Sequence, residues 1–492
     1  MNKIMLAIDD YQLPFKRNLC YYMSKPIIHE DPVVSPSGSA DAVATQFFGT
    51  VLYDAGTYRM WYYGMPALNP CYAESHDGIS WTKPDLGQVE IQGNKKNNAL
   101  LLTDESILGV AVIKDDDDPD PQRRYKMVYN PRQEHGKVAS KYGRPRSTLR
   151  TAISPDGIKW MSNTDYAIDV FAEHSSFYKF NGLFVVHAQA LFPGENGLVG
   201  PNGDGSRQGY AWVSADFDTW LEAPVQAFTL PEPADPARRG HGLGEDGSAD
   251  IHGTVGNYDQ VHLGVGGVPF SNVVVGVYGL WHQRGWGEGG TNCDLGLVIS
   301  NDGIHFREPV KNYVYISSQD SPSTPVAGKD FPTLLCQGNG LVNVGDKTRI
   351  YHGRWRNADG GDGRAGSPDY TSEVALAELP RDRWGALGLF PEEDLGHVWS
   401  ELIHIRNDKI EISLNIDDAK NISVELSDEQ FNLLPEYSGA NRGFCLDSKG
   451  LECKVIWPKG DLQSFGSRPL RLRVNFKRID GNNPLLYAVY LK

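Results

Sequence analysis

A carboxylate and an imidazole stand two residues apart at Asp250 and His252. On a β-strand, residues with this spacing face the same side, so both side chains can point into one site. There the histidine can tune the pKa of the carboxyl group or orient a sugar hydroxyl. We therefore predict Asp250 as a catalytic nucleophile or base and His252 as a substrate-binding residue. The alternative is a buried hydrogen-bonded pair that ties neighbouring sheets together.

Other carboxylates precede apolar, strand-like runs elsewhere in the chain. Glu173 is followed by His174 and such a run, and Asp41 and Asp330 stand before two others. Hydrolysis of a glycosidic bond needs two carboxyl groups, one as nucleophile or base and one as an acid with a raised pKa. We predict Glu173 as the acid and Asp41 as a further catalytic carboxylate. Asp330 and His174 are predicted to bind substrate, and the pair at 104–105 is a weaker candidate.

Two segments combine tryptophan with polar side chains, as sugar-binding sites do. Trp281 and Arg284 lie in a glycine-rich stretch, and Arg354 lies in the segment Tyr351–Arg356. Glycines permit close approach to a ligand, and an aromatic ring can support the apolar face of a sugar. We predict that all three residues bind substrate, with the arginines able to bind a carboxylate on an acidic sugar. The alternative for Arg354 is a structural role between sheets.

One signature, Ser-x-Asp-Gly-x-x-Trp, recurs along the chain. Its copies begin at Ser75, Ser154 and Ser300, with a degenerate copy at Ser214 and a weaker fifth one in Leu379–Trp384. The aspartate can cap a tight turn, the glycine can take a positive φ, and the aromatic ring can pack back against the sheet. A pair of apolar strands precedes each copy. Each unit therefore predicts about four strands, which is one blade of a propeller.

After about residue 395 the pattern changes to strands that alternate apolar and polar residues, as in 402–416 and 470–476. Such alternation is typical of an antiparallel sandwich. The sequence thus predicts an all-β chain with two domains, a five-bladed β-propeller at 1–395 and a C-terminal β-sandwich at 396–492. Few aromatic residues of the sandwich fall outside its apolar pattern, which favours a supporting role for it.

Composition agrees with a β-rich protein of two domains. The 492 residues include 53 Gly, 30 Pro, 23 Tyr, 18 Phe and 11 Trp, which indicates many turns and aromatic-rich strands. A net charge of −15 disfavours nucleic acid and anionic membranes as partners. The six cysteines form no C-x-x-C pair, so we expect reduced thiols and no zinc cluster. The N-terminus lacks the long apolar core of a secretory signal, which predicts a cytoplasmic protein if the chain is complete.

The predicted architecture resembles glycoside hydrolase family 32 and its propeller-bearing relatives, among them family 43. The resemblance covers most of the chain and rests on the Tyr-Arg-Met-Trp-Tyr-Tyr-Gly block at 58–64, the repeated turns, the segment 375–382 and the last strands. It implies a carbohydrate substrate. It also leaves open a calcium ion in the propeller channel, although no spacing here demands a metal, and no other cofactor is expected. The chain departs from family 32 in having neither a WMNDPNG-like segment nor any Arg-Asp-Pro.

Two classes of function remain open. The first is a glycoside hydrolase that cleaves a small oligosaccharide or glycoside in the central propeller pocket with a pair of carboxylates. The second is a catalytically silent propeller that binds carbohydrate or a protein. A glycoside phosphorylase is a third option, and it would need a basic phosphate pocket beside the acid.

Overall fold

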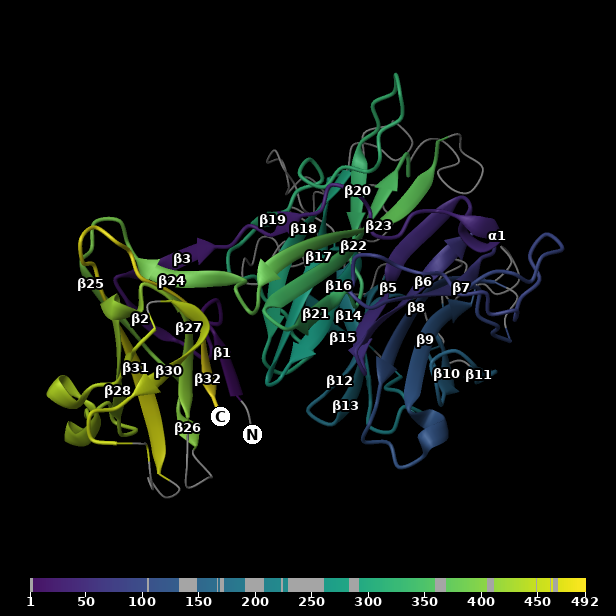
Figure 1. Cartoon of the computed structure of the whole chain (residues 1–492). Helices are drawn as coiled ribbons and strands as arrows, with labels where there is room; N and C mark the ends of the chain where they lie inside the picture. The colour runs from purple at the N-terminus through teal and green to yellow at the C-terminus, as the bar shows by residue number, and fades with distance from the viewer. Residues whose placement is uncertain are drawn as a thin grey trace, which may run out of the picture.

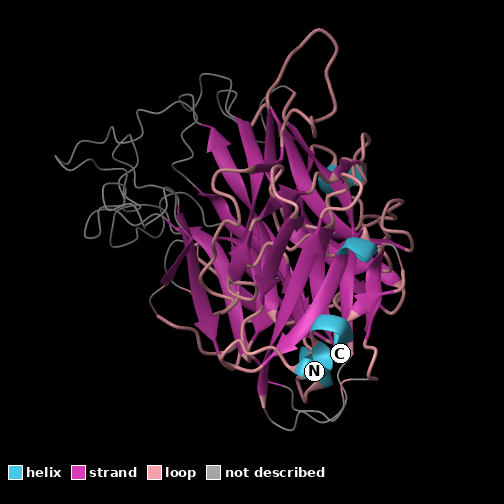
Figure 2. Ribbon diagram, turned by 90° about the vertical axis from the view of Figure 1, so that its left-hand side faces the viewer, coloured by secondary structure: helices cyan, strands magenta, loops and turns pink. Residues whose placement is uncertain are grey.

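The computed structural model describes residues 3–103, 106–131, 148–165, 167–168, 172–190, 208–222, 224–228, 261–282, 292–358, 369–404, 411–447, 449–460, 462 and 468–492. Within these ranges the chain is almost entirely β-structure, as predicted (Figures 1 and 2). The helices are short: α1 (Gly38–Asp41) and the 3-10 turns Pro121–Arg123, Ala419–Asn421, Pro435–Tyr437 and Gly439–Asn441. No described helix is long and apolar enough to cross a membrane.

Consecutive strands form five antiparallel groups, which we number as the first to fifth sheets. The first holds β5 (Ala44–Asp54), β6 (Thr57–Met65) and β7 (Asn69–Ser75). The second holds β8 (Ile107–Lys114), β9 (Tyr125–Pro131), β10 (Arg150–Ser154) and β11 (Met161–Ser162). The third holds β12 (Glu173–Phe180), β13 (Leu183–Ala190), β14 (Gln208–Ser214) and β15 (Val225–Phe228).

The fourth and fifth sheets are joined at one parallel pair, Cys293 with Leu334. The fourth holds β16 (Val261–Phe270), β17 (Val273–His282), β18 (Asn292–Ser300) and β19 (Val314–Ile316). The fifth holds β20 (Thr333–Cys336), β21 (Leu341–Val344), β22 (Lys347–Arg356), β23 (Thr371–Pro380) and β4 (Ile27–Ile28). β9 is buried along its whole length, including Lys126 and Asn130, whose polar groups are bonded within the protein.

The first strands of these sheets lie beside one another. β5 packs beside β8, β8 beside β12, and β12 beside β16. Asn339, just before β21 of the fifth sheet, bonds to three of the other sheets through its side chain and backbone. Its side-chain amide donates to Gly267 O at 2.9 Å and accepts from Phe177 N at 2.7 Å, while its backbone N donates to Gly49 O at 2.8 Å. One buried asparagine therefore ties the first, third, fourth and fifth sheets together.

Two further sheets enclose a separate apolar core, and we call them the C-terminal sheet pair. One holds β1 (Lys3–Leu6), β3 (Leu19–Met23), β24 (Gly385–Leu389), β27 (Ile412–Asp417), β29 (Phe444–Cys445), β30 (Gly450–Ile456) and β32 (Leu485–Leu491). The other holds β2 (Phe15–Arg17), β25 (Leu395–Trp399), β26 (Ile403–His404), β28 (Ile422–Ser427) and β31 (Pro469–Lys477). In Figure 1 the sheet pair lies to the left of the five sheets.

The strand pairing departs from the expected division at 395/396. β1 pairs with β32, β2 with β25 and β3 with β24, so the N-terminal strands belong to the C-terminal sheet pair. β24 itself ends before residue 395. These pairings join segments more than 300 residues apart, and a local apolar pattern carries no information about such partners.

The repeated signature forms the turn that the sequence predicts. In the first copy Gly78 N donates to Ser75 Oγ at 2.9 Å, and the carboxylate of Asp77 accepts from Ile79 N at 2.8 Å and Ser80 N at 2.7 Å. Trp81 Nε1 then donates to Gly78 O at 3.2 Å. The serine and aspartate bonds recur in the copies at 154–160, 214–220 and 300–306. The fifth copy differs, because its Asp382 bonds to Asn343 and Tyr490 rather than to its own turn.

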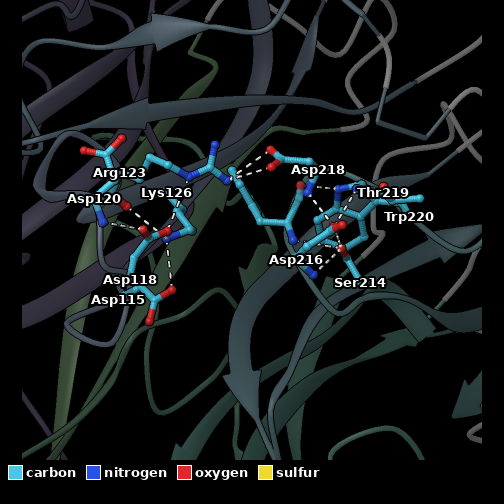
Figure 3. A network of polar contacts seen from close by, with 11 residues as sticks. Asp115, Asp118, Asp120, Arg123, Lys126, Ser214, Asp216, Asp218, Thr219 and Trp220 are labelled. Atoms are coloured by element: carbon cyan, nitrogen blue, oxygen red, sulfur yellow. Dashed lines mark hydrogen bonds and ion pairs between the residues drawn. The ribbon is translucent and has the colours of Figure 1, made fainter.

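Each of these turns also docks on a neighbouring sheet. Tyr351 of the fifth sheet donates to Gly78 O at 2.7 Å, Trp61 of the first sheet donates to Gly157 O at 2.8 Å, and Tyr178 of the third sheet donates to Gly303 O at 2.8 Å. Between the second and third sheets, Arg123 bonds both oxygens of Asp218, at 3.1 and 2.9 Å (Figure 3). The signature therefore recurs because it holds neighbouring sheets together.

Candidate functional site

One end of the five sheets gathers the polar residues that could do chemistry. The first strands β5, β12 and β16 begin there, and the second strands β6, β9, β13, β17 and β22 end there. Predicted residues Asp250, His252 and Arg284 fall in 229–260 and 283–291, which lie outside the described residues. The same holds for Asp104 and Glu105, while Trp281 is described only by its backbone, paired with Cys293.

Glu173 opens β12 at this end, and its side chain is partly exposed. Gln189 of β13 faces it across the sheet, donates from Nε2 to the carboxylate, and accepts from Leu263 N at 2.7 Å. These bonds link the third and fourth sheets and fix the orientation of the carboxylate. Burial, and then the nearby charge of Glu173, raise the pKa of the Cys336 thiol well above its ordinary value. Leu263 belongs to the apolar cluster that contains Cys336, so Gln189 joins Glu173 to this cluster.

That cluster carries a partly exposed aromatic surface. Phe48 and Trp355 pack against buried Leu263, Cys293, Leu334 and Cys336. The ring centroids of Phe48 and Trp355 are 5.6 Å apart, and Phe48 stacks on Tyr63 at 6.4 Å. Trp355 also meets His262 edge-on at 6.0 Å. Such rings suit the apolar face of a sugar, and a carboxylate joined to their cluster through Gln189 suits its hydroxyls.

Two more polar pairs lie at this end. Gln46 of β5 donates to Tyr370 Oη. His174 is buried, and its Nδ1 lies 2.7 Å from Asn130 Oδ1, which acts as the acceptor because Asn130 Nδ2 donates to Thr148 O and Ala172 O. The histidine therefore carries its proton on Nδ1. Burial lowers its pKa to about 4, so the ring is neutral at pH 7.

The predicted residues Asp41, Arg354 and Asp330 do not join this group through the contacts described. Asp41 is fully buried in α1, accepts from Tyr62 Oη at 2.6 Å, and pairs with Lys83 at 2.5 Å. These bonds are those of a structural carboxylate, and a catalytic role for Asp41 stays a prediction that they do not favour. Asp330 is exposed in the loop before β20.

Arg354 is buried and satisfied within the protein. It donates to Ser321 Oγ at 2.8 Å and to the carbonyl oxygens of Glu30 at 2.9 Å and His29 at 2.8 Å. These contacts tie β22 to the segment that follows β4, as in the structural alternative for this residue. Substrate binding by Arg354 stays a prediction.

Sequence reasoning missed Gln46, Phe48 and Gln189. Gln46 and Gln189 are polar residues near the start or the end of a strand, which is a weak signal on its own, and Phe48 looks like any apolar strand residue. Only strand register shows that Gln189 pairs directly with Glu173. Among the described residues, no group of three or more His, Cys, Asp or Glu side chains could hold a metal ion. Each of the six cysteines is a free thiol.

No protein-family model and no curated protein sequence matches the chain. Among solved structures, it is similar to a glycosyl hydrolase from Bacteroides ovatus, with 15% identity, 74% of this chain and 95% of that chain covered, and a TM-score of 0.44. It is also similar to a family 117 glycoside hydrolase from Zobellia galactanivorans, with 13% identity, 74% and 90% covered, and a TM-score of 0.36.

A third similar structure is described with the GH130 family of mannoside phosphorylases, which contains glycoside hydrolases that target β-1,2 mannosidic linkages in Candida mannan. Identity is 14%, the coverage is 76% of this chain and 97% of that chain, and the TM-score is 0.38. These similarities do not assign the chain to a family.

Proposed function

We propose that this chain is a glycosidase built on a five-bladed β-propeller with a β-sandwich formed by the C-terminal sheet pair. The propeller is proposed because the chain has five sheets whose first strands lie side by side. One observation carries the activity: Glu173, a partly exposed carboxylate at the end where the first strands begin, is bonded by Gln189, which also bonds Leu263 of the cluster that carries the rings of Phe48 and Trp355.

In this proposal Glu173 is the general acid. It donates a proton to the glycosidic oxygen as the bond to the leaving sugar breaks, and Gln189 holds the carboxyl group in place. Phe48 and Trp355 support the sugar ring. With its proton on Nδ1, the neutral His174 has only an acceptor at Nε2, so it is not a proton donor there. Asp250 remains the proposed nucleophile or base.

The test is Glu173→Gln, assayed on glycosides that share one sugar but differ in leaving group. A panel of dinitrophenyl glycosides first identifies the sugar. A dinitrophenolate is a good leaving group that needs no proton, whereas the alcohol released from a disaccharide must be protonated as it leaves. Loss of the acid should therefore lower kcat by about 10²- to 10⁴-fold on a disaccharide, with a much smaller effect on the dinitrophenyl glycoside.

Glu90→Gln, which changes an exposed carboxylate of a loop in the first sheet, is the matched control and should behave as wild type. Equal loss on both substrates, or full activity of Glu173→Gln on the disaccharide, would contradict the role of Glu173. A wild-type protein that binds sugars but cleaves none of the panel would favour the second candidate.

That second candidate is a catalytically silent propeller that binds carbohydrate or a protein. It is favoured by Asp41 and Arg354, two groups expected to meet substrate, because both are buried and satisfied by contacts within the protein. A structural scaffold needs such bonds, and a catalytic site needs some polar groups left for its substrate.

A further inference from the structure

The outer face of the sheet β2–β25–β31–β28 carries arginines and aromatic rings in two cross-strand rows. Burial alternates along β31, so that Leu470, Leu472, Val474 and Phe476 enter the core and the residues between them face outward. Register then aligns the outward side chains. One row is Phe15, Trp399, Arg473 and Glu425; the other is Arg17, His397, Asn475 and Ser423.

The rings of this face contact one another edge to face. The centroids of Phe15 and Phe431 are 5.4 Å apart, and those of Trp399 and Phe431 are 5.3 Å apart. Phe15 is 48% exposed and Phe431 41% exposed. Large exposed apolar patches on soluble proteins commonly mark interaction sites, and these linked rings give the face an apolar surface of that kind.

Guanidinium groups lie over the same rings. Arg471 lies 4.4 Å from the centroid of Phe431, and Arg473 lies 5.3 Å from that of Trp399. Arg471 also donates to Ser400 O at 3.1 Å. Its Nε donates to Glu429 O at 3.4 Å, so stacking and two backbone bonds hold the planar group in one orientation and leave its Nη end to bind a carboxylate. We call Phe15, Arg17, Trp399, Phe431, Arg471 and Arg473 the arginine–aromatic face.

The strands of this face carry three arginines on a chain whose net charge is −15. Their one carboxylate, Glu425, is engaged by Asn475 Nδ2 at 3.0 Å and lies 3.6 Å from Arg473, while the loop of Phe431 adds Asp428 and Glu429. Burial, together with the charges of Arg473 and Arg17, also lowers the pKa of His397, which is consistent with a positive local field. The arginines of this face are therefore complementary in charge to an anionic ligand.

The face is formed by one side of a sheet, with side chains about 7 Å apart along each strand and about 5 Å apart across strands. Such a surface fits an extended chain rather than a compact molecule. We propose that the arginine–aromatic face binds a chain of carboxylated sugars, with the carboxylates on Arg471 and Arg17 and the apolar faces of the sugars on the exposed rings. The choice of a glycan over another anionic polymer rests on the proposed function of the first site.

The test is calorimetric titration of the full chain with tetragalacturonate, with cellotetraose as the neutral analogue. Binding of tetragalacturonate should weaken several-fold when sodium chloride is raised from 50 to 500 mM, because exposed charges are screened. Cellotetraose should bind at least tenfold more weakly. Equal binding of the two sugars, or no binding of tetragalacturonate, would overturn the proposal.

Variants locate the binding. Arg471→Gln and Trp399→Ala should each weaken binding at least tenfold, and Arg471→Lys should restore only part of it, since lysine lacks the planar fork. Lys454→Gln removes a 53% exposed cation from β30 of the other sheet and should bind as wild type. Unchanged binding by Arg471→Gln in a protein with native near-ultraviolet circular dichroism would refute the site. Equal affinity for a single-stranded oligonucleotide would refute the assignment to sugars.

The two proposals fail separately. Glu173→Gln should bind tetragalacturonate at the arginine–aromatic face as wild type does. Binding by a protein without glycosidase activity would support this face and count against the first site alone, whereas activity without binding would do the opposite.

Discussion

Phe217 occupies a turn position that three other copies of the signature give to glycine. Its φ is +74°, beside +74° at Gly78, +77° at Gly157 and +78° at Gly303. A left-handed conformation costs a non-glycine residue about 1–2 kcal/mol. Phe217 nevertheless suits the position, because its ring is 1% exposed and lies 5.6 Å from that of Phe177.

The two effects can be weighed in one variant. Phe217→Gly relieves the backbone strain but removes a buried ring worth about 3–5 kcal/mol. Burial should win, so that the free energy of unfolding falls by about 2–3 kcal/mol in a urea titration. The companion change Gly157→Ala introduces the same backbone strain without burying a ring. Its Cβ would also lie 2.9 Å from Trp61 Cζ2, so this variant should be less stable than wild type. A Phe217→Gly protein more stable than wild type would show that strain dominates.

The β8–β9 hairpin holds two kinds of ion pair that differ in burial (Figure 3). Lys126 is fully buried, with Nζ 2.9 Å from Asp115 and 2.7 Å from Asp118, whereas Arg123 pairs with the 61% exposed Asp218. Lys126→Ala should cost about 1.5–3 kcal/mol of unfolding free energy, because it removes buried charged hydrogen bonds and leaves Asp115 only Lys179 and Asp118 only Arg123 as ion-pair partners. Arg123→Ala should cost about 0.2–1 kcal/mol. Similar losses in the two variants would contradict this reasoning.

Acid titration gives a second check on the same hairpin. Burial alone would raise the pKa of Asp115, but bonds from Lys179 and Lys126 outweigh it and hold the pKa below its ordinary value of 3.8. The pKa of Asp118 is lowered in the same way, chiefly by Lys126. The stability these groups contribute is present above their ordinary pKa and is lost as the pH falls through the lowered values. The difference between Lys126→Ala and wild type should therefore shrink below about pH 4.

At the scale of elements, the sequence predicts what is local and misses what is paired at long range. The turn at Asp77 could be predicted because its bonds stay within five residues. Glu173 could be proposed from the sequence because it precedes an apolar strand, but its partner Gln189 reaches it only through register between strands. The place of β1 beside β32 was missed for the same reason.

The whole molecule depends on how the fifth sheet joins the C-terminal sheet pair. Arg383 follows β23 and bonds both oxygens of Asp417, at 3.1 and 3.0 Å, and Asn415 Oδ1 at 2.9 Å. Its guanidinium lies 4.2 Å from the ring centroid of Tyr487. The segment predicted as a fifth copy of the repeated turn thus serves a different purpose here. It docks on the C-terminal sheet pair, where the other copies dock on a neighbouring sheet.

Arg383→Ala should therefore loosen the sheet pair while leaving the first sheet intact. Charged hydrogen bonds contribute about 1.5–3 kcal/mol each, and partial exposure of Asp417 keeps the loss near the lower value. Hydrogen exchange should quicken in β27 and β32 and stay unchanged in β5 and β6, because opening would be local. Arg442→Ala, a change in an arginine outside this contact, should leave all four strands as in wild type. Faster exchange throughout the molecule would mean that the two parts unfold as one unit. No change would mean that apolar packing between the parts, such as that of Ile4 and Leu6 with Val275, is enough to hold them together.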